Sequence, residues 1–205
     1  MTPDVTPIAL LNVANNMPED AELWDGITEK QITDWETKWK PDLKRAQLSR
    51  NVTAQLDQSQ HWDWRKKSQA LEGMLALRGF SIVCNDITQG LMLVDTTSKR
   101  ALIESQRGKD LVYIDYIENA PWNRSVLYNP PLYSGVGSIL MRAAIALSEE
   151  EGFKGRIGLH SLPQADKFYI KSCGMTCLGQ DPRYHNLRYF EMTPEQAQEF
   201  INKGS

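Results

Sequence analysis

Two neighbouring segments carry the residues best suited to chemistry. The first, Ile114 to Arg124, joins the carboxylates Asp115 and Glu118 to a proline, and the second is a loop with Gly135 and Gly137 that opens a predicted helix. Glycines at such a junction let backbone N–H groups approach a phosphate, and the positive end of the helix dipole favours the anion. A tight turn that needs two glycines is the structural alternative. The loop lacks the Gly-Lys-Ser/Thr ending of a P-loop and the third glycine of a dinucleotide fold.

A third block makes this order of motifs more specific. A strand-like stretch runs into Ala165 to Met175, which contains an Ala-x-x-Phe-Tyr sequence. Residues 61–195 resemble the GNAT superfamily of N-acetyltransferases. The resemblance rests on three features in the order and spacing of that family, namely the strand before a proline, the Gly-x-Gly loop and this block. Leu132 stands where that family usually has Gln or Arg, and Leu162 or Ser161 stands where it often has Asn.

The resemblance implies a GNAT-like acyl-CoA N-acyltransferase fold with acetyl-CoA as co-substrate. It implies that the cofactor lies where the strand ending at Asn119 separates from the strand ending at His160. Backbone groups from Ile117 to Asn119 would pair with the pantetheine amides and polarise the thioester carbonyl. Backbone amides of the glycine loop would hold the pyrophosphate, and these belong to Tyr133, Ser134, Gly135, Val136, Gly137 and Ser138.

The implied reaction is direct attack of a neutral primary amine on the thioester, which needs a base, and an acid for the departing thiolate. Tyr169 matches the family's tyrosine after the fifth strand and is the predicted acid, with simple packing as its alternative. Glu118 and Asp115 face opposite sides of one strand, so only one faces the acceptor. We expect Glu118 to be the base and Asp115 to be second, and an ordinary hydrogen-bonded ion pair is the alternative for either. His160 is a further candidate base because histidine titrates near neutral pH.

The elements that must position these residues begin with an N-terminal strand and helices. Residues 8–14 form an apolar run that is too short for a signal peptide and predicts a short strand or a docking segment. Thr28 and Gln31 give a capping-box signature, and an apolar stripe then predicts a core-facing helix through Ile32, Trp35, Trp39 and Leu43. Pro41 is expected to break or kink it. A second helix is expected over residues 61–77, with Gly79 as its stop.

Beyond Gly79 the pattern changes to strands. Three strand-like stretches, 80–84, 90–95 and 111–117, predict an antiparallel meander. The remaining expected elements are a helix over 137–151, a strand over 156–160, a helix over 164–172 ended by Gly174, strands over 175–178 and 187–192, and a last helix capped by Thr193 with Pro194 and Gln196. Helices between the later strands imply a parallel pair, so the sequence predicts a mixed α/β sheet. We expect residues 1–60 to form an N-terminal helical extension of a GNAT-like domain over residues 61–205.

Composition limits the partners of this chain. Its 205 residues are 41% hydrophobic with a net charge of −3, which is ordinary for a globular protein and gives no reason to expect nucleic acid as a partner. No stretch approaches the ~18 apolar residues of a membrane span. The cysteines Cys84, Cys173 and Cys177 fit no metal or redox motif, so we expect no metal site, packing roles for these thiols and a reducing cytoplasm.

The sequence therefore predicts a cytoplasmic, acetyl-CoA-dependent N-acetyltransferase that acts on a small-molecule or peptide amine. A catalytically inert CoA-binding or protein-interaction module with the same fold is the alternative. Trp35 and Trp39 offer more apolar area than one amphipathic helix needs, so a homodimer is possible. The acceptor is expected to meet the first two helices and the loop of residues 179–186. Trp62 and Trp64 cannot both face inward on one helix, so one is free for cation–π contact or packing at an interface.

Overall fold

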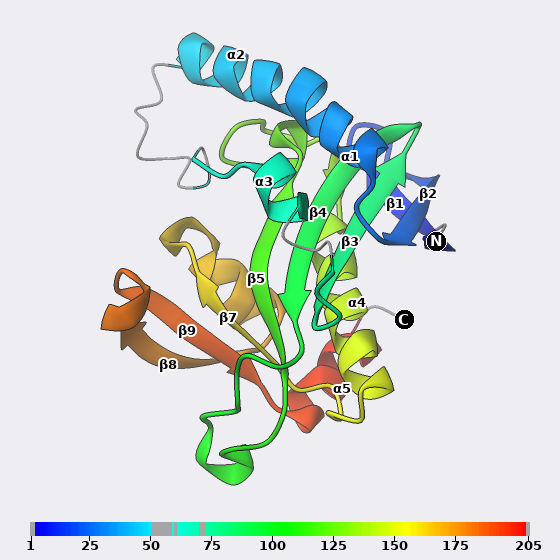
Figure 1. The fold of residues 1–205 in the computed structure, drawn as a ribbon. Helices are drawn as coiled ribbons and strands as arrows, with labels where there is room; N and C mark the ends of the chain where they lie inside the picture. The colour runs from blue at the N-terminus through cyan, green and yellow to red at the C-terminus, as the bar shows by residue number, and fades with distance from the viewer. Residues whose placement is uncertain (1–2, 51–58, 60, 70–72, 204–205) are drawn as a thin grey trace. The chain divides into compact units, whose positions relative to one another are not determined.

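The computed structural model describes residues 3–50, 59, 61–69 and 73–203. Within these residues, nine strands are hydrogen-bonded into a mixed sheet in the order β6-β1-β2-β3-β4-β5-β7-β9-β8 (Figure 1). The predicted mixed α/β architecture is therefore confirmed. The chain divides into two compact units, Met1–Leu93 with Tyr116–Leu140 and Val94–Asp115 with Met141–Ser205.

The strands are β1 Asp4–Asn12, β2 Met17–Asp25, β3 Leu77–Cys84, β4 Ile87–Asp95, β5 Val112–Asn119, β6 Tyr133–Ser134, β7 Ile157–Ser161, β8 Thr176–Asp181 and β9 Leu187–Met192. The α-helices are α1 Glu29–Asp34, α2 Lys40–Arg50, α3 Trp64–Gln69, α4 Val136–Glu150 and α5 Pro194–Asn202. Two π-helical turns, Trp35–Trp39 and Phe168–Ser172, complete the longer helical segments.

The first unit begins with the hairpin of β1 and β2. The sequence predicted a strand only in the region of β1. β1 pairs along its whole length with β2, which in turn pairs antiparallel with β3, and the short β6 adds to the other edge of β1. The prediction missed β2 because Met17 to Asp20 are an exposed Met-Pro-Glu-Asp run without apolar alternation. The pairing partner on each side, rather than the residue pattern, determines this strand.

The helical segment after β2 carries the predicted core stripe. The capping box of Thr28 and Gln31 is confirmed, since the Thr28 N–H donates to the Gln31 side chain at 2.8 Å. The irregularity expected at Pro41 takes the form of the π turn just before it, after which α2 continues through the proline. Proline has no N–H to donate and its ring crowds the preceding turn, which a wider turn accommodates. Ile32, Trp35 and Trp39 of the predicted stripe lie in one buried cluster with Trp64, Leu91, Leu93 and Ala120, whereas Leu43 is half-buried and lies outside this cluster.

The helix expected over residues 61–77 is confirmed only over Trp64–Gln69, since residues 61–63 precede it without helical structure. The described helix α3 ends at Gln69, residues 70–72 lie outside the described residues, and Gly73 adopts a turn with φ +80°. Leu77 already begins β3, so Gly79 lies inside a strand instead of ending a helix. The place of β3 in the sheet between β2 and β4 outweighs the helical spacing of the leucines before it.

The predicted meander is confirmed, and it places helices on both faces of β4. Asn85 and Asp86, both with positive φ, form the two-residue turn between β3 and β4, and β5 lies beside β4. A Cβ on Gly90 would lie 2.7 Å from Val136, so the glycine lets the first turn of α4 approach this strand. Leu91 and the next alternate residues instead face the tryptophan cluster, on the side of α1 and α3 (Figure 1).

The second unit contains the predicted parallel pair. β7 runs parallel to the first half of β5 and antiparallel to β9, which pairs with β8. The helix expected over 164–172 is a short 3-10 turn followed by the π-helical turn, and it ends at Gly174 with φ +69°. The capping box of Thr193 and Gln196 at the start of α5 is confirmed.

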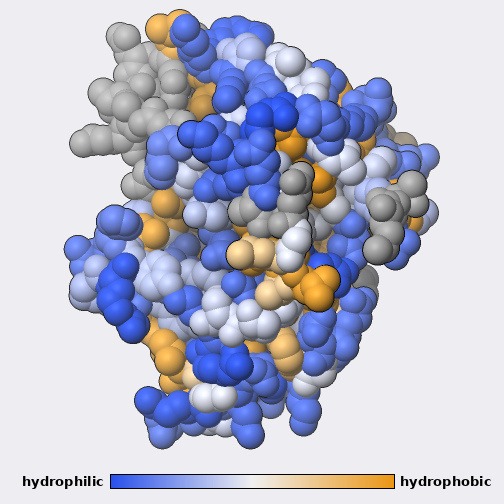
Figure 2. All heavy atoms as spheres, in the orientation of Figure 1, coloured by the Kyte–Doolittle hydropathy of each residue, from blue (hydrophilic) through white to orange (hydrophobic). Residues whose placement is uncertain are grey.

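The surface offers little broad apolar area on the face drawn in Figure 2, where hydrophobic residues lie scattered among hydrophilic ones. Among the described residues, no helix combines the length and the apolar character that a membrane crossing requires.

Candidate functional site

Glu118, the predicted base near the end of β5, accepts hydrogen bonds at both carboxylate oxygens. Oε1 accepts from Ser59 Oγ at 2.7 Å and from Arg124 Nη2 at 2.6 Å, and Oε2 accepts from Trp64 Nε1. The Glu118 side chain is 6% exposed and that of Arg124 is 12% exposed. Glu118 therefore forms the hydrogen-bonded ion pair that the sequence left open as the alternative to a free base.

Arg124 also fixes the backbone at the end of β5. Its Nε donates to the carbonyl oxygen of Asn119 at 2.8 Å while its Nη2 binds the neighbouring Glu118. One guanidinium thus joins a side chain and a main-chain group of adjacent residues. The result is a rigid strand end in the segment from Ile117 to Asn119, whose backbone the sequence assigns to the pantetheine chain and the thioester.

An aromatic cluster covers the same face of β5 as Glu118. Trp62 meets Tyr116 edge to face with ring centroids 5.1 Å apart, and it meets Trp64 in the same way at 6.5 Å. Trp64 is fully buried, and Trp62 is half-buried and packs against the same buried cluster. The prediction that only one of them faces inward is therefore wrong, because Trp62 precedes α3 and does not follow its helical spacing. Lys67 Nζ lies 3.1 Å from the centroid of the Tyr116 ring and 5.5 Å from that of Trp62.

The glycine loop before α4 is held by a side chain of β2 and by one of the 3-10 turn after β5. The Tyr133 hydroxyl donates to Glu19 at 2.6 Å, and burial together with this bond raises the pKa of the phenol. The Tyr133 N–H donates to Asn123 Oδ1 at 3.0 Å, so this amide of the predicted phosphate set is already engaged. Gly135 has φ +90°, a backbone conformation that favours glycine.

The amides that remain for an anion belong to the start of α4. The first N–H groups of an α-helix lack an intrahelical acceptor, and here they belong to Val136, Gly137 and Ser138. A Cβ built on Gly135 meets no atom within 4 Å, so the loop borders open space. Geometry and helix dipole together suit a phosphate at this position.

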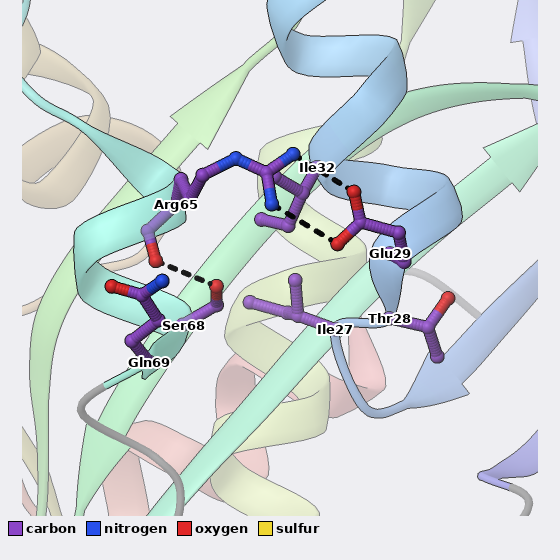
Figure 3. Close-up of a pocket in the computed structure, with 7 residues that line it drawn as sticks. All are labelled: Ile27, Thr28, Glu29, Ile32, Arg65, Ser68 and Gln69. Carbon is purple, nitrogen blue, oxygen red and sulfur yellow. Dashed lines mark hydrogen bonds and ion pairs between the residues drawn. The ribbon is translucent and has the colours of Figure 1, made fainter.

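A pocket of about 400 Å³ lies between the start of α1 and the helix α3 (Figure 3). Arg65 crosses it and forms ion pairs with Glu29 and Glu36, each with a shortest distance of 2.8 Å. Hydrogen bonds from Arg65 lower the pKa of both carboxyls, and the same bonds raise the pKa of the guanidinium. The rest of the lining is mixed and consists of Ile27, Thr28, Ile32, Ser68 and Gln69.

His160 lies near the end of β7 in the second unit, among aromatic rings. Its Nδ1 lies 2.6 Å from the Tyr113 hydroxyl, and its ring stacks on Tyr184 with centroids 3.8 Å apart. Burial lowers the pKa of the imidazole, although Asp181, 3.4 Å from Nε2, acts in the opposite direction. The neutral imidazole is therefore the favoured form at neutral pH.

Tyr169 and Asp115 also belong to the second unit, whereas Glu118 and the glycine loop belong to the first. Tyr169 lies in the π-helical turn, packs against Phe190 with centroids 5.8 Å apart and is buried. Burial raises the pKa of its phenol, which keeps the protonated form that an acid needs. Asp115 is half-buried in β5.

Comparisons with known proteins agree with this architecture. Neither protein-family models nor curated protein sequences give a significant match to the chain. Among solved structures, PaiA N-acetyltransferase from Thermoplasma acidophilum, in complex with coenzyme A, has a TM-score of 0.55 at 9% identity over 84% of this chain and 98% of its own. The chain has the GNAT N-acetyltransferase fold. Mycobacterium smegmatis RimJ, in complex with CoA-disulfide, has a TM-score of 0.52 at 16% identity over 100% of this chain and 98% of its own. An uncharacterized protein from Bacillus halodurans has a TM-score of 0.56 at 11% identity over 95% and 94% of the two chains.

Sequence reasoning found the strand and the loop of this GNAT fold but missed the side chains that hold them. Ser59 lies 59 residues from Glu118 in the chain, and nothing in its surroundings marks it as a partner. Arg124 is the last residue of the segment from Ile114, six residues after Glu118. A cation this close to a carboxylate on a buried strand is a sequence signal for the ion pair that the two residues form. Within the described residues, no cluster of three or more His, Cys, Asp or Glu side chains could hold a metal ion.

Proposed function

We propose that this chain is an acetyl-CoA-dependent N-acetyltransferase that transfers an acetyl group to a primary amine. The observation that carries the proposal is the GNAT fold with an open glycine loop at the start of α4. Two proteins with the same fold, PaiA and RimJ, were crystallised with coenzyme A or its disulfide. We also propose a cytoplasmic location, because Cys84 and Cys173 are free thiols, as is usual in a reducing compartment.

Coenzyme A would be held mainly by backbone groups. We assign its pyrophosphate to the N–H groups from Ser134 to Ser138, leaving out Tyr133, whose N–H is engaged by Asn123. Leu132, 41% exposed, supplies no polar group where the family usually has Gln or Arg. The affinity therefore depends on the helix dipole and the loop geometry.

The thioester is assigned to the backbone from Ile117 to Asn119. A backbone N–H that bonds the thioester carbonyl stabilises the oxyanion that forms when an amine attacks. Such a donor helps only if it is fixed in advance, and the bonds of Arg124 to Asn119 and Glu118 hold this strand end. We therefore propose Glu118 as the anchor of the strand end, and not as the base.

The proton-transfer roles fall to groups in the second unit. His160 is proposed as the base because its neutral form, which can accept a proton, is favoured at neutral pH. Tyr169 is proposed as the acid because its phenol stays protonated. Asp115 is the second candidate for the base.

The acceptor is proposed to be a small-molecule or peptide amine that enters the pocket between α1 and α3. Two carboxylates, Glu29 and Glu36, face a single guanidinium from Arg65, so this group of side chains is negative overall. A negative surface raises the local concentration of cationic amines.

Calorimetric titration with acetyl-CoA tests the cofactor. Ser138→Asp places a carboxylate at the start of α4 and should weaken binding by about tenfold, through like-charge repulsion with the pyrophosphate. Ala146→Asp is the matched control, because it puts the same charge at an exposed position far along the same helix. Equal binding by the two variants would contradict the assignment.

Turnover is tested by thiol release with polyamines, aminoglycosides, amino acids and peptides as acceptors. One acceptor that is acetylated excludes the inert CoA-binding module, the second candidate function. That alternative is kept because Glu118, the expected base, is bound in an ion pair. Binding of acetyl-CoA without turnover of any acceptor would favour it.

A further inference from the structure

Three consecutive basic residues of α3 have different surroundings. Arg65 is paired with Glu29 and Glu36, and Lys66 is exposed. Lys67 is half-buried, and its ammonium nitrogen lies 3.1 Å from the centroid of the Tyr116 ring. Lys67 alone of the three brings a primary amine onto β5.

The ring under Lys67 belongs to the strand end at which the thioester is proposed to bind. Tyr116 directly precedes the segment from Ile117 to Asn119, and it points to the same face of β5 as Glu118. Trp62 is the second ring near the same nitrogen, with its centroid 5.5 Å away. A lysine side chain is long and flexible, so a rotation about its terminal bonds moves the amine along the strand.

We propose that Lys67 is a self-acetylation site, at which this chain transfers the acetyl group of acetyl-CoA to its own side chain. The proposal rests on the acetyltransferase function proposed above. The ring faces of Trp62 and Tyr116 hold the ammonium by cation–π attraction and keep it beside the strand end. An amine held there reacts in an intramolecular step, which proceeds faster than reaction of an equivalent amine free in solution.

The step balances as follows in atoms and charge. The Lys67 ammonium loses one proton to water, and the free amine attacks the carbonyl carbon of the thioester. The new N–C bond forms as the C–S bond breaks, and the sulfur leaves as the CoA thiolate. The second proton lost by the nitrogen neutralises that thiolate, so the products are free CoA and an acetylated, uncharged Lys67. Loss of the charge removes the cation–π contact with Tyr116.

The experiment incubates the full chain with acetyl-CoA and measures acetylation of each lysine by peptide mass spectrometry. We expect Lys67 to be acetylated at least about tenfold faster than Lys66, at a rate independent of protein concentration. The heat-unfolded chain gives the chemical background for both lysines. Lys66→Arg should leave the reaction at Lys67 unchanged. Equal rates at the two lysines in the folded chain would overturn the proposal.

Two variants at Tyr116 test the role of the ring. Tyr116→Phe keeps the aromatic face and should retain rapid acetylation of Lys67, whereas Tyr116→Leu should reduce it to the rate at Lys66. Calorimetric titration with CoA on the same samples separates this proposal from the proposed function. Binding of CoA and turnover of an added amine without acetylation of Lys67 would overturn self-acetylation alone. Absence of CoA binding would overturn both.

Discussion

Glu118 and His160 are two candidate bases near strand ends, and their surroundings differ in kind. Each side chain is 6% exposed. Glu118 has a cation at 2.6 Å and two neutral donors. His160 has tyrosine rings around it, and the charge of its nearest carboxylate, Asp181, is shared with Arg183 at 3.0 Å.

The difference shows two ways of burying a titratable group. At Glu118 the charge is paired, because both carboxylate oxygens accept hydrogen bonds and one of them binds the Arg124 guanidinium. At His160 the charge is avoided, because burial lowers the pKa of the imidazole and leaves a neutral ring that can accept a proton. Burial alone therefore does not indicate a base, since the partners decide which protonation state is stable.

The largest effect is expected from removing the cation beside Glu118. Arg124→Met leaves a buried carboxylate without its charged partner, and we expect a loss of about 3–5 kcal/mol of unfolding free energy in urea titrations. The double variant Arg124→Met with Glu118→Gln should recover part of this loss, because the uncompensated charge is gone. A loss below about 1 kcal/mol for the single variant would mean that water reaches the pair, as it does for exposed ion pairs.

The contrast also explains what could be predicted from sequence. Local signals were reliable, as in the capping boxes of Thr28 with Gln31 and Thr193 with Gln196, because all partners lie within four residues. The core roles of Trp35 and Trp39 followed from helical spacing. The hydrogen-bond partners of Glu118 did not follow, because Ser59 and Trp64 are distant in the sequence and only the fold brings them to the carboxylate.

The sequence predictions for strand β2 and for the end of α3 were wrong for a related reason. β2 owes its conformation to pairing with β1 and β3, and its own residues show no regular alternation of apolar and polar side chains. Leu77 continues a helical spacing yet joins β3, because the sheet supplies partners that a single helix lacks. Patterns within one segment cannot report on partners elsewhere in the chain.

Substitution of His160, the proposed base, tests the second residue of the comparison. His160→Gln should reduce the rate of acetyl transfer by roughly a hundredfold, because a general base typically contributes at least that much. Glu118→Gln should leave the pH dependence of the rate as in the unaltered chain, because the role proposed for Glu118 is to hold the strand end and not to transfer a proton. A pH profile altered only by Glu118→Gln would reverse the assignment and restore the base expected from the sequence.

The acid role of Tyr169 predicts a smaller effect. Tyr169→Phe should lower the transfer rate by about tenfold, while the dissociation constant of CoA changes little, because only the proton on the departing thiolate is affected. The packing of the ring against Phe190 is retained in phenylalanine. An unchanged rate would remove Tyr169 from the reaction and leave it as a core residue.

The smallest effect is on the pH dependence of stability. The pKa of His160 is lower in the folded chain than its ordinary value of 6.5, so the unfolded chain binds the proton more readily. The stabilising contribution of the neutral ring is therefore fully present above pH 6.5 and is lost as the pH falls through the folded pKa.

Urea titrations from pH 8 to pH 5 should show this loss in the unaltered chain and a weaker one in His160→Gln. Glu118→Gln is the matched control and should keep the slope of the unaltered chain in this range, because it leaves the imidazole and its hydrogen-bond partners in place. If both variants kept that slope, the imidazole would not be the group that titrates, and the distinction between a paired and a neutral buried group would fail.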